Sequence, residues 1–113
     1  MPLTTLLIEF DPLPQRTMQL LLESVECDVF VLDNEQALPA LLKNVAFDVI
    51  VVSTLGSIRA PLLAAEQSKK LQPVAHLLLW GPTVLGEANC PYVDRQLMMP
   101  CTLSQLKMAI RPN

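Results

Sequence analysis

The sequence predicts an α/β domain in which helices cover both faces of a five-stranded parallel sheet. Short apolar runs typical of strands alternate with segments of helical spacing along the whole chain. The central runs are apolar without alternation, which is typical of strands buried on both faces. The 113 residues provide one hydrophobic core and leave no room for a second. We therefore expect a single domain over residues 1–113.

Five apolar runs are predicted as strands, the third being rich in β-branched residues and the fifth the weakest. They are residues 6–8 with Phe10, 29–32, 49–52, 77–80 and 96–99. Strand and helix alternate, so right-handed crossovers are expected between parallel strands. The usual order of five such strands is 2-1-3-4-5, the flavodoxin-like arrangement.

Four segments show helical spacing of apolar residues. Their stripes are Leu13, Met18, Leu21, Leu22 and Val25; Ala37, Leu38, Leu41 and Leu42; Leu62, Leu63 and Leu71; and Leu103, Leu106 and Ile110. Asp33 or Asn34 is expected to cap the second helix, and Pro39 to delay its start or bend it. Pro61 is expected to begin the third helix. Thr102 and Gln105 have the spacing of a capping box at the start of the last.

The stretch from Gly81 to Asp94 has the weakest periodicity and contains Pro82, Gly86 and Pro91. It predicts either a short helix of two turns around residues 84–89 or a loop. Any helix before the fifth strand is therefore expected to be short or irregular.

Charge and hydropathy exclude several classes of protein. Hydrophobic residues make up 51% of the chain and charged residues 17%, with a net charge of −3. The basic residues are scattered, which argues against direct nucleic-acid binding. No apolar run is long enough for a membrane span, and the first residues lack the basic start of a signal peptide. We expect a cytoplasmic domain without membrane contact, part of whose apolar surface is covered by a partner.

The cysteines and the histidine give no sign of a metal or redox site. Cys27, Cys90 and Cys101 are far apart in the sequence, and neither a disulfide framework nor a zinc site has that spacing. They are interpreted as buried or half-buried apolar residues. His76 is interpreted as a strand residue rather than a ligand or base. No metal and no cofactor is expected.

Four segments resemble the receiver domain of two-component response regulators. They are residues 7–12, 47–53, 77–81 and 93–100, and the resemblance covers about residues 3–111. It implies the CheY-like form of the flavodoxin-like fold. It also implies a site at the carboxyl edge of the sheet, where the family holds a phosphorylated aspartate, metal-binding acids, a threonine or serine, and a lysine.

At most of these positions the chain departs from the family's pattern. The departures are Ser53 for the aspartate, Met99 for the lysine, Trp80 for the threonine, Phe10 for one metal-binding acid, and Gln96 for an aromatic switch residue. Glu9 remains, with Asp11 two residues later. Transfer of a phosphoryl group to a carboxylate needs the acceptor, a divalent cation and a positive charge. We therefore expect a degenerate, non-phosphorylatable pseudo-receiver with no catalytic residue and no enzymatic activity of its own.

Other interpretations of these residues remain open. Ser53 as an acceptor would need a base beside it, and none is evident from the sequence. An unorthodox acceptor would be Asp48 or Asp11, although Asp48 should face away from the site. Glu9 and Asp11 are interpreted as a pair of solvated acids that would hold Mg²⁺ poorly.

The apolar residues at the site and the loop after the first strand bear on two further alternatives. Met99 is interpreted as apolar filler, whereas Trp80 is either filler, a docking surface or part of a crevice for a small ligand. A flavin phosphate site is excluded, since Pro12 and Pro14 lack N–H groups in the loop after the first strand.

The resemblance implies a protein-interaction module. Its partner would be a kinase core, a true receiver or an output domain. The parent protein would be a hybrid sensor histidine kinase or, alternatively, a transcription or antitermination regulator with this domain at its N-terminus. The short last helix is expected to be followed by more chain. A shortened helix before the fifth strand is expected to uncover apolar surface, which would support homodimerisation or docking. The predicted interaction residues are Leu85, Tyr92, Gln96 and Met108.

Overall fold

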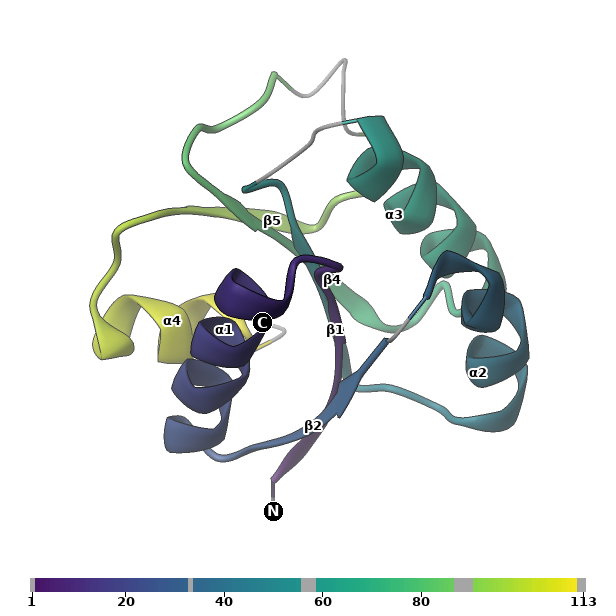
Figure 1. The fold of residues 1–113 in the computed structure, drawn as a ribbon, viewed down its shortest axis with the longest axis horizontal. Coiled ribbons are helices and arrows are strands. Elements are labelled where there is room, and N and C mark those ends of the chain that lie inside the picture. Colours follow the sequence, from purple (N-terminus) through teal and green to yellow (C-terminus); the bar gives the residue numbers. More distant parts are fainter. Residues whose placement is uncertain (1, 33, 56–58, 87–90, 112–113) are drawn as a thin grey trace.

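The computed structural model describes residues 2–32, 34–55, 59–86 and 91–111, and these form one α/β layer structure (Figure 1). The strands are β1 (Leu3–Ile8), β2 (Cys27–Val31), β3 (Val49–Ser53), β4 (His76–Gly81) and β5 (Arg95–Met98). The helices are α1 (Pro12–Ser24), α2 (Leu38–Asn44), α3 (Arg59–Leu71) and α4 (Leu103–Ala109). All strand pairs are parallel in the order β2-β1-β3-β4-β5, which confirms the predicted fold class.

Two buried clusters lie on opposite faces of the sheet. One cluster joins Leu7 and Val51 of the sheet to residues of α1 and α4, and the other joins Leu6 and Val52 to residues of α2 and α3. Figure 1 shows α1 and α4 on the left of the sheet and α2 and α3 on its right. Successive strand residues point to opposite faces. The continuous apolar runs of β3 and β4 are therefore buried on both sides, as predicted.

The buried faces of some helices differ from the predicted stripes. In α3 the buried residues are small ones, Pro61, Ala64, Ala65 and Ser68, whereas Leu63 is 60% exposed. Small side chains let the helix axis approach the sheet closely, so Leu63 and Leu71 are exposed, whereas Leu62 is half-buried against the α2–α3 cluster. Leu13, at the start of α1, is likewise 81% exposed.

Predicted helix starts agree more closely with the structure. Asn34 caps a short 3₁₀ turn at Glu35–Ala37, and α2 begins only at Leu38 with Pro39 in its first turn. Pro39 therefore delays the helix rather than bending it. Thr102 forms the expected capping box with Gln105 at the start of α4. Helix α3 begins at Arg59, two residues before Pro61.

No helix precedes β5 in residues 82–86 and 91–94, so the described part of the predicted helix at 84–89 is a loop. Residues 87–90, including Cys90, lie outside the described residues. Leu85 and Val93 pack against the α2–α3 cluster in place of a helix. The Gln96 side chain donates to the Leu85 carbonyl and accepts from its N–H, both at 2.7 Å. The Gln96 side chain thus fastens Leu85 to β5.

Three predictions about isolated residues are confirmed. His76 is a buried residue of β4, and its Nε2 donates to the Ala109 carbonyl at 2.9 Å. Cys27 is buried and Cys101 is half-buried, and both are free thiols. Burial raises the pKa of both thiols, which keeps them protonated and unreactive.

Across the described ranges, none of the helices has the length and hydropathy that a membrane crossing requires.

Candidate functional site

The candidate site lies where β1 and β3 end side by side at the carboxyl edge of the sheet. The register pairs Ile8 with Val52, so the next residues, Glu9 and Ser53, are neighbours. The Ser53 hydroxyl donates a hydrogen bond to Oε2 of Glu9. Both side chains are buried, at 7% and 3% exposure respectively. The site therefore contains a carboxylate–hydroxyl pair shielded from water.

Further hydrogen bonds join this pair to the loops that follow the two strands. Oε1 of Glu9 accepts from the Asp11 N–H at 2.9 Å, and the Ser53 hydroxyl accepts from the Leu55 N–H at 3.3 Å. The Gln15 side chain donates to the Glu9 carbonyl at 2.6 Å. The prediction that Glu9 is a solvated acid is wrong, because strand pairing holds it against Ser53. The Glu9 carboxylate also stands beside Ser53 as a group that can accept its proton, whereas no such base was expected from the sequence.

Asp11 does not join Glu9 in a metal site. Its carboxylate caps α1 by accepting from the Leu13 N–H at 3.3 Å, and it is exposed. Among the described residues, no three His, Cys, Asp or Glu side chains form a group that could hold a metal ion. A divalent cation of the Mg²⁺ type needs several oxygen ligands in near-octahedral geometry. The residues present do not fit such a cation.

A cavity of about 190 Å³ opens beside the pair. Its lining consists of Ile8, Glu9, Phe10, Asp11, Ser53, Ala60 and Pro61. Phe10 also packs against the α2–α3 cluster, so it forms part of the wall rather than a ligand. No lysine or arginine is among these described lining residues. The described lining therefore offers no positive charge to an anionic group.

Trp80 fills the space under the site instead of facing solvent, and Met99 is half-buried beside the same cluster. Trp80 pairs with Ser53 in the β3–β4 register, is fully buried and packs in the α1–α4 cluster. Met99 packs against the same cluster, and its N–H donates to the Gly81 carbonyl at 2.8 Å. Met99 is thus the apolar filler that the sequence predicted. For Trp80 the structure excludes the docking-surface alternative.

Asp48, the unorthodox acceptor considered from the sequence, lies at the opposite edge of the sheet. It precedes β3, and its carboxylate accepts from the Thr4 N–H at 2.9 Å. The expectation that it faces away from the site is confirmed.

The four predicted interaction residues lie on two sides of β5. Leu85 and Gln96 lie on the side of α3 and are half-buried, whereas Met108 is 70% exposed on α4. The Arg95 guanidinium donates to the Met108 carbonyl at 2.7 Å, linking β5 to α4. The structure thus separates Met108 from the other three by the edge strand.

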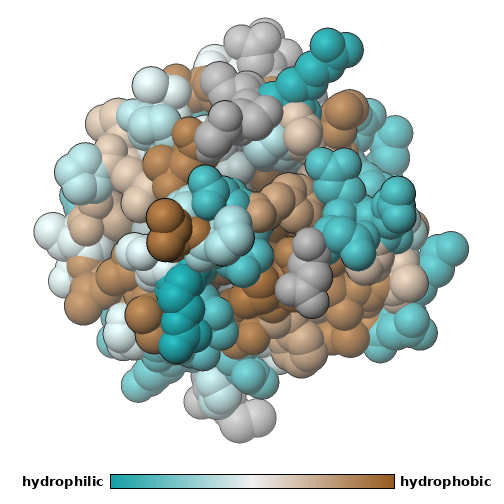
Figure 2. Space-filling model, viewed as in Figure 1, coloured by the Kyte–Doolittle hydropathy of each residue, from teal (hydrophilic) through white to brown (hydrophobic). Residues whose placement is uncertain are grey.

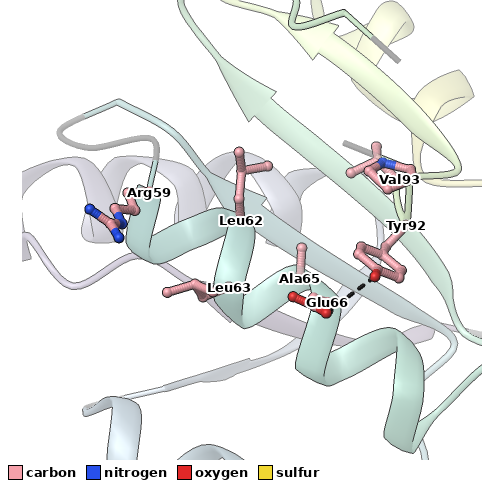
Figure 3. Close-up of a pocket in the computed structure, with 8 residues that line it drawn as sticks. Arg59, Leu62, Leu63, Ala65, Glu66, Tyr92 and Val93 are labelled. Carbon is pink, nitrogen blue, oxygen red and sulfur yellow. Dashed lines mark hydrogen bonds between the residues drawn. The ribbon is translucent and has the colours of Figure 1, made fainter. Parts of the chain in front are cut away.

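Tyr92 borders a second cavity of about 190 Å³ (Figure 3). Its lining residues are Arg59, Leu62, Leu63, Ala65, Glu66, Pro91, Tyr92 and Val93. The Tyr92 hydroxyl donates to Glu66 at 3.1 Å. Figure 3 shows Tyr92 and Val93 facing the first turns of α3 across this apolar space. Sequence periodicity could not find it, because it forms between a helix and a loop.

The fold has many counterparts among solved structures. A response regulator of Thermotoga maritima in complex with Mg²⁺ and BeF matches with a TM-score of 0.79 at 13% identity, covering 96% of this chain and 95% of that one. The receiver domain of a Pseudomonas aeruginosa sensor histidine kinase, with a magnesium ion in its active-site cleft, gives 0.72 at 16% identity, covering 97% and 95%.

A third match is to a response regulator of Burkholderia pseudomallei with a phosphorylated aspartic acid. The TM-score is 0.75 at 20% identity, and the match covers 96% of this chain but 66% of that chain. No family model matches the sequence, and no curated protein is significantly similar to it. The chain therefore has the CheY-like fold, at a level of sequence identity that speaks to the fold alone.

Proposed function

We propose that this chain is a receiver-like domain of two-component signalling that accepts no phosphoryl group and acts through contacts with other proteins. Its place would be in the cytoplasm, within a longer protein such as a hybrid histidine kinase. The fold supports the receiver assignment, since its structural counterparts are receiver domains.

One observation carries the loss of phosphorylation. Ser53 occupies the end of β3, where the resemblance puts the acceptor aspartate, and its hydroxyl is already donated to the buried Glu9. A phosphoryl group arriving there would meet the Glu9 carboxylate with no cation to offset the repulsion. Met99 replaces the positive charge with a thioether packed into the core.

Incubation with acetyl phosphate and Mg²⁺, followed by intact-mass measurement, tests this proposal. We expect no added phosphoryl group, while a working receiver domain treated in parallel gains one. Ser53→Ala and Asp11→Asn serve as matched variants, because each removes one oxygen nucleophile near the cavity. A phosphoryl adduct on the wild-type chain contradicts the proposal.

An atypical phosphoacceptor is the second candidate, and one contact favours it. The Ser53 Oγ would attack the phosphorus of a donor while Glu9 accepted the hydroxyl proton. This step would form a phosphoserine and release the donor's leaving group. An adduct that disappears in Ser53→Ala but persists in Asp11→Asn would identify this chemistry.

Protein contacts are the proposed output of the domain. Met108, exposed on α4, and Tyr92, half-buried beside the apolar cavity on α3, are the features that a kinase core, true receiver or output domain could cover. The low charged fraction of the chain, 17%, supports a partner-covered surface. A second copy could cover either of these two sides of β5.

Titration of the neighbouring domain of the parent protein tests this surface. We expect Met108→Glu or Tyr92→Ser to weaken binding, because each removes apolar contact area. Val74→Glu is a matched control, since Val74 is 96% exposed in the turn before β4. Equal binding by all three variants and the wild type would show that the surface is misassigned.

A further inference from the structure

The sheet ends at β2 in an edge strand that lacks the usual protection against strand pairing. Edge strands are normally guarded by lysines, prolines, bulges or a covering element. The sequence of β2 is Cys-Asp-Val-Phe-Val, with a single charge and no proline. Phe30 is 39% exposed, and Val29 and Val31 are half-buried. Figure 2 shows apolar surface between α1 and α2, in the area where Figure 1 places β2.

The outward-facing backbone groups of β2 follow from its pairing with β1. The Leu3 N–H donates to the Glu26 carbonyl, and the Leu32 N–H donates to the Leu7 carbonyl. Alternate residues of a parallel strand bond to the same neighbour. The even-numbered residues of β2 therefore bond to β1. The odd-numbered residues Cys27, Val29 and Val31 direct their N–H and C=O groups away from the sheet, with no hydrogen-bond partner among the described residues.

An antiparallel copy of the same strand satisfies these groups in one register. With Val29 opposite Val29 of the second copy, Cys27 lies opposite Val31, and the three outward residues become hydrogen-bonded pairs. One face of the pair is then entirely apolar, and it continues the α1–α4 cluster against which Val29 and Val31 pack.

Charge also permits this register. On the other face Asp28 lies opposite Phe30 of the second copy, and the two Asp28 residues are only diagonal neighbours across the axis. No carboxylate of the strand opposes another, so the pairing escapes the like-charge penalty that direct opposition brings. The other edge strand differs, because β5 carries Arg95 and is followed closely by Pro100.

We propose that two copies of this chain associate through antiparallel pairing of β2 about a two-fold axis at Val29, forming one continuous sheet. The surface lies at the opposite end of the sheet from β5. It is therefore separate from the proposed partner surface around Tyr92 and Met108, and both can be occupied at once.

Sedimentation of the wild type up to about 1 mM tests the association, since weak protein contacts have dissociation constants in this range. We expect a dimer whose dissociation constant rises about tenfold or more in Val29→Lys, where two like charges would face each other across the axis. Val29→Thr is the matched control, because it keeps the β-branched shape and should still dimerise. Met108→Glu should leave the dimer intact.

Amide hydrogen exchange on the wild type tests the register and does not depend on a variant folding. Protection of the Cys27, Val29 and Val31 amides should increase with protein concentration. Protection of the Asp28 and Phe30 amides, already bonded to β1, should not. A wild type that is monomeric at about 1 mM overturns the proposal. A dimer that persists in Val29→Lys, or one that is lost in Met108→Glu, also overturns it. The same holds if exchange of the Cys27, Val29 and Val31 amides does not change with protein concentration.

Discussion

At the scale of single residues, the decisive contact is the hydrogen bond from Ser53 to Glu9. The sequence points to both residues as site positions, but it does not predict that they contact each other. A buried carboxylate is costly unless hydrogen bonds compensate for the lost water. Glu9 has two such donors, the Ser53 hydroxyl and the Asp11 N–H. The pair therefore contributes to stability as well as closing the site.

We expect Ser53→Ala to lower the free energy of unfolding by about 1–3 kcal/mol, because it leaves a buried acceptor without one partner. Urea denaturation measures this change. In a Glu9→Gln background the same substitution should cost less, since the group left unpaired is neutral. Equal costs in the two backgrounds would mean that the charge of Glu9 plays no part.

Gly81 is required by the close approach of Thr54. A Cβ at position 81 would lie 1.7 Å from Oγ1 of Thr54, which itself is buried. We expect Gly81→Ala to destabilise the protein by about 1–3 kcal/mol through overpacking. Thr54→Ala removes the clashing oxygen and should restore part of that loss in the double variant. Additive effects in the double-mutant cycle would argue against the clash.

At the scale of elements, Asp94 joins α3, β4 and β5. Its Oδ2 accepts from Lys69 at 2.6 Å and from the Leu77 N–H at 2.8 Å. Burial alone would raise the pKa of this carboxyl. The hydrogen bonds from Lys69 and Leu77, with the charges of Lys69 and His76, outweigh burial and lower it. Residues 91–94 are thus fixed to the sheet at the residue before β5.

We expect Asp94→Asn to cost about 1 kcal/mol at neutral pH, a value reduced for the partial exposure of the pair. The folded-state pKa is lowered, so the stabilising effect is complete above the ordinary aspartate pKa of 3.8 and is lost as pH falls below it. Urea denaturation of both proteins across this range should show their stabilities converging in acid.

Lys70 provides the matched control for that interaction. Its bond to Glu66 is an exposed i,i+4 pair at 3.2 Å. Solvent screens an exposed pair of this kind, so Lys70→Met should change stability far less than Lys69→Met. A larger effect of Lys70→Met would contradict the greater contribution assigned to the ion pair between Lys69 and Asp94.

At the scale of the whole molecule, Trp80 reports on the core. It is fully buried in the cluster that joins β1, β3 and β4 to α1 and α4. Small domains of this size usually unfold in a single cooperative step. We expect the Trp80 fluorescence transition and the far-ultraviolet circular dichroism transition to coincide in urea. Separate midpoints would indicate that this face of the sheet unfolds independently.

The sequence by itself determined the α/β class, the strand order and the residues at the carboxyl edge. The strand order rests on the usual order of such folds, and the edge residues rest on the receiver resemblance. The class follows from local signals: continuous apolar runs, helical spacing between them, and the capping box at Thr102. The same signals misplaced the buried face of α3, because hydropathy favours Leu63 over Ala64 and Ala65, whereas packing distance favours the smaller residues.

Only the tertiary structure decided which distant residues meet. The contact of Glu9 with Ser53 depends on the register of β1 with β3, and the burial of Trp80 depends on α1 and α4 packing on the same face. The outward backbone groups of β2 depend on which edge of the sheet stays unpaired. Apolar periodicity fixes local structure along one segment, whereas contacts between segments depend on strand register and on how closely each helix can approach the sheet.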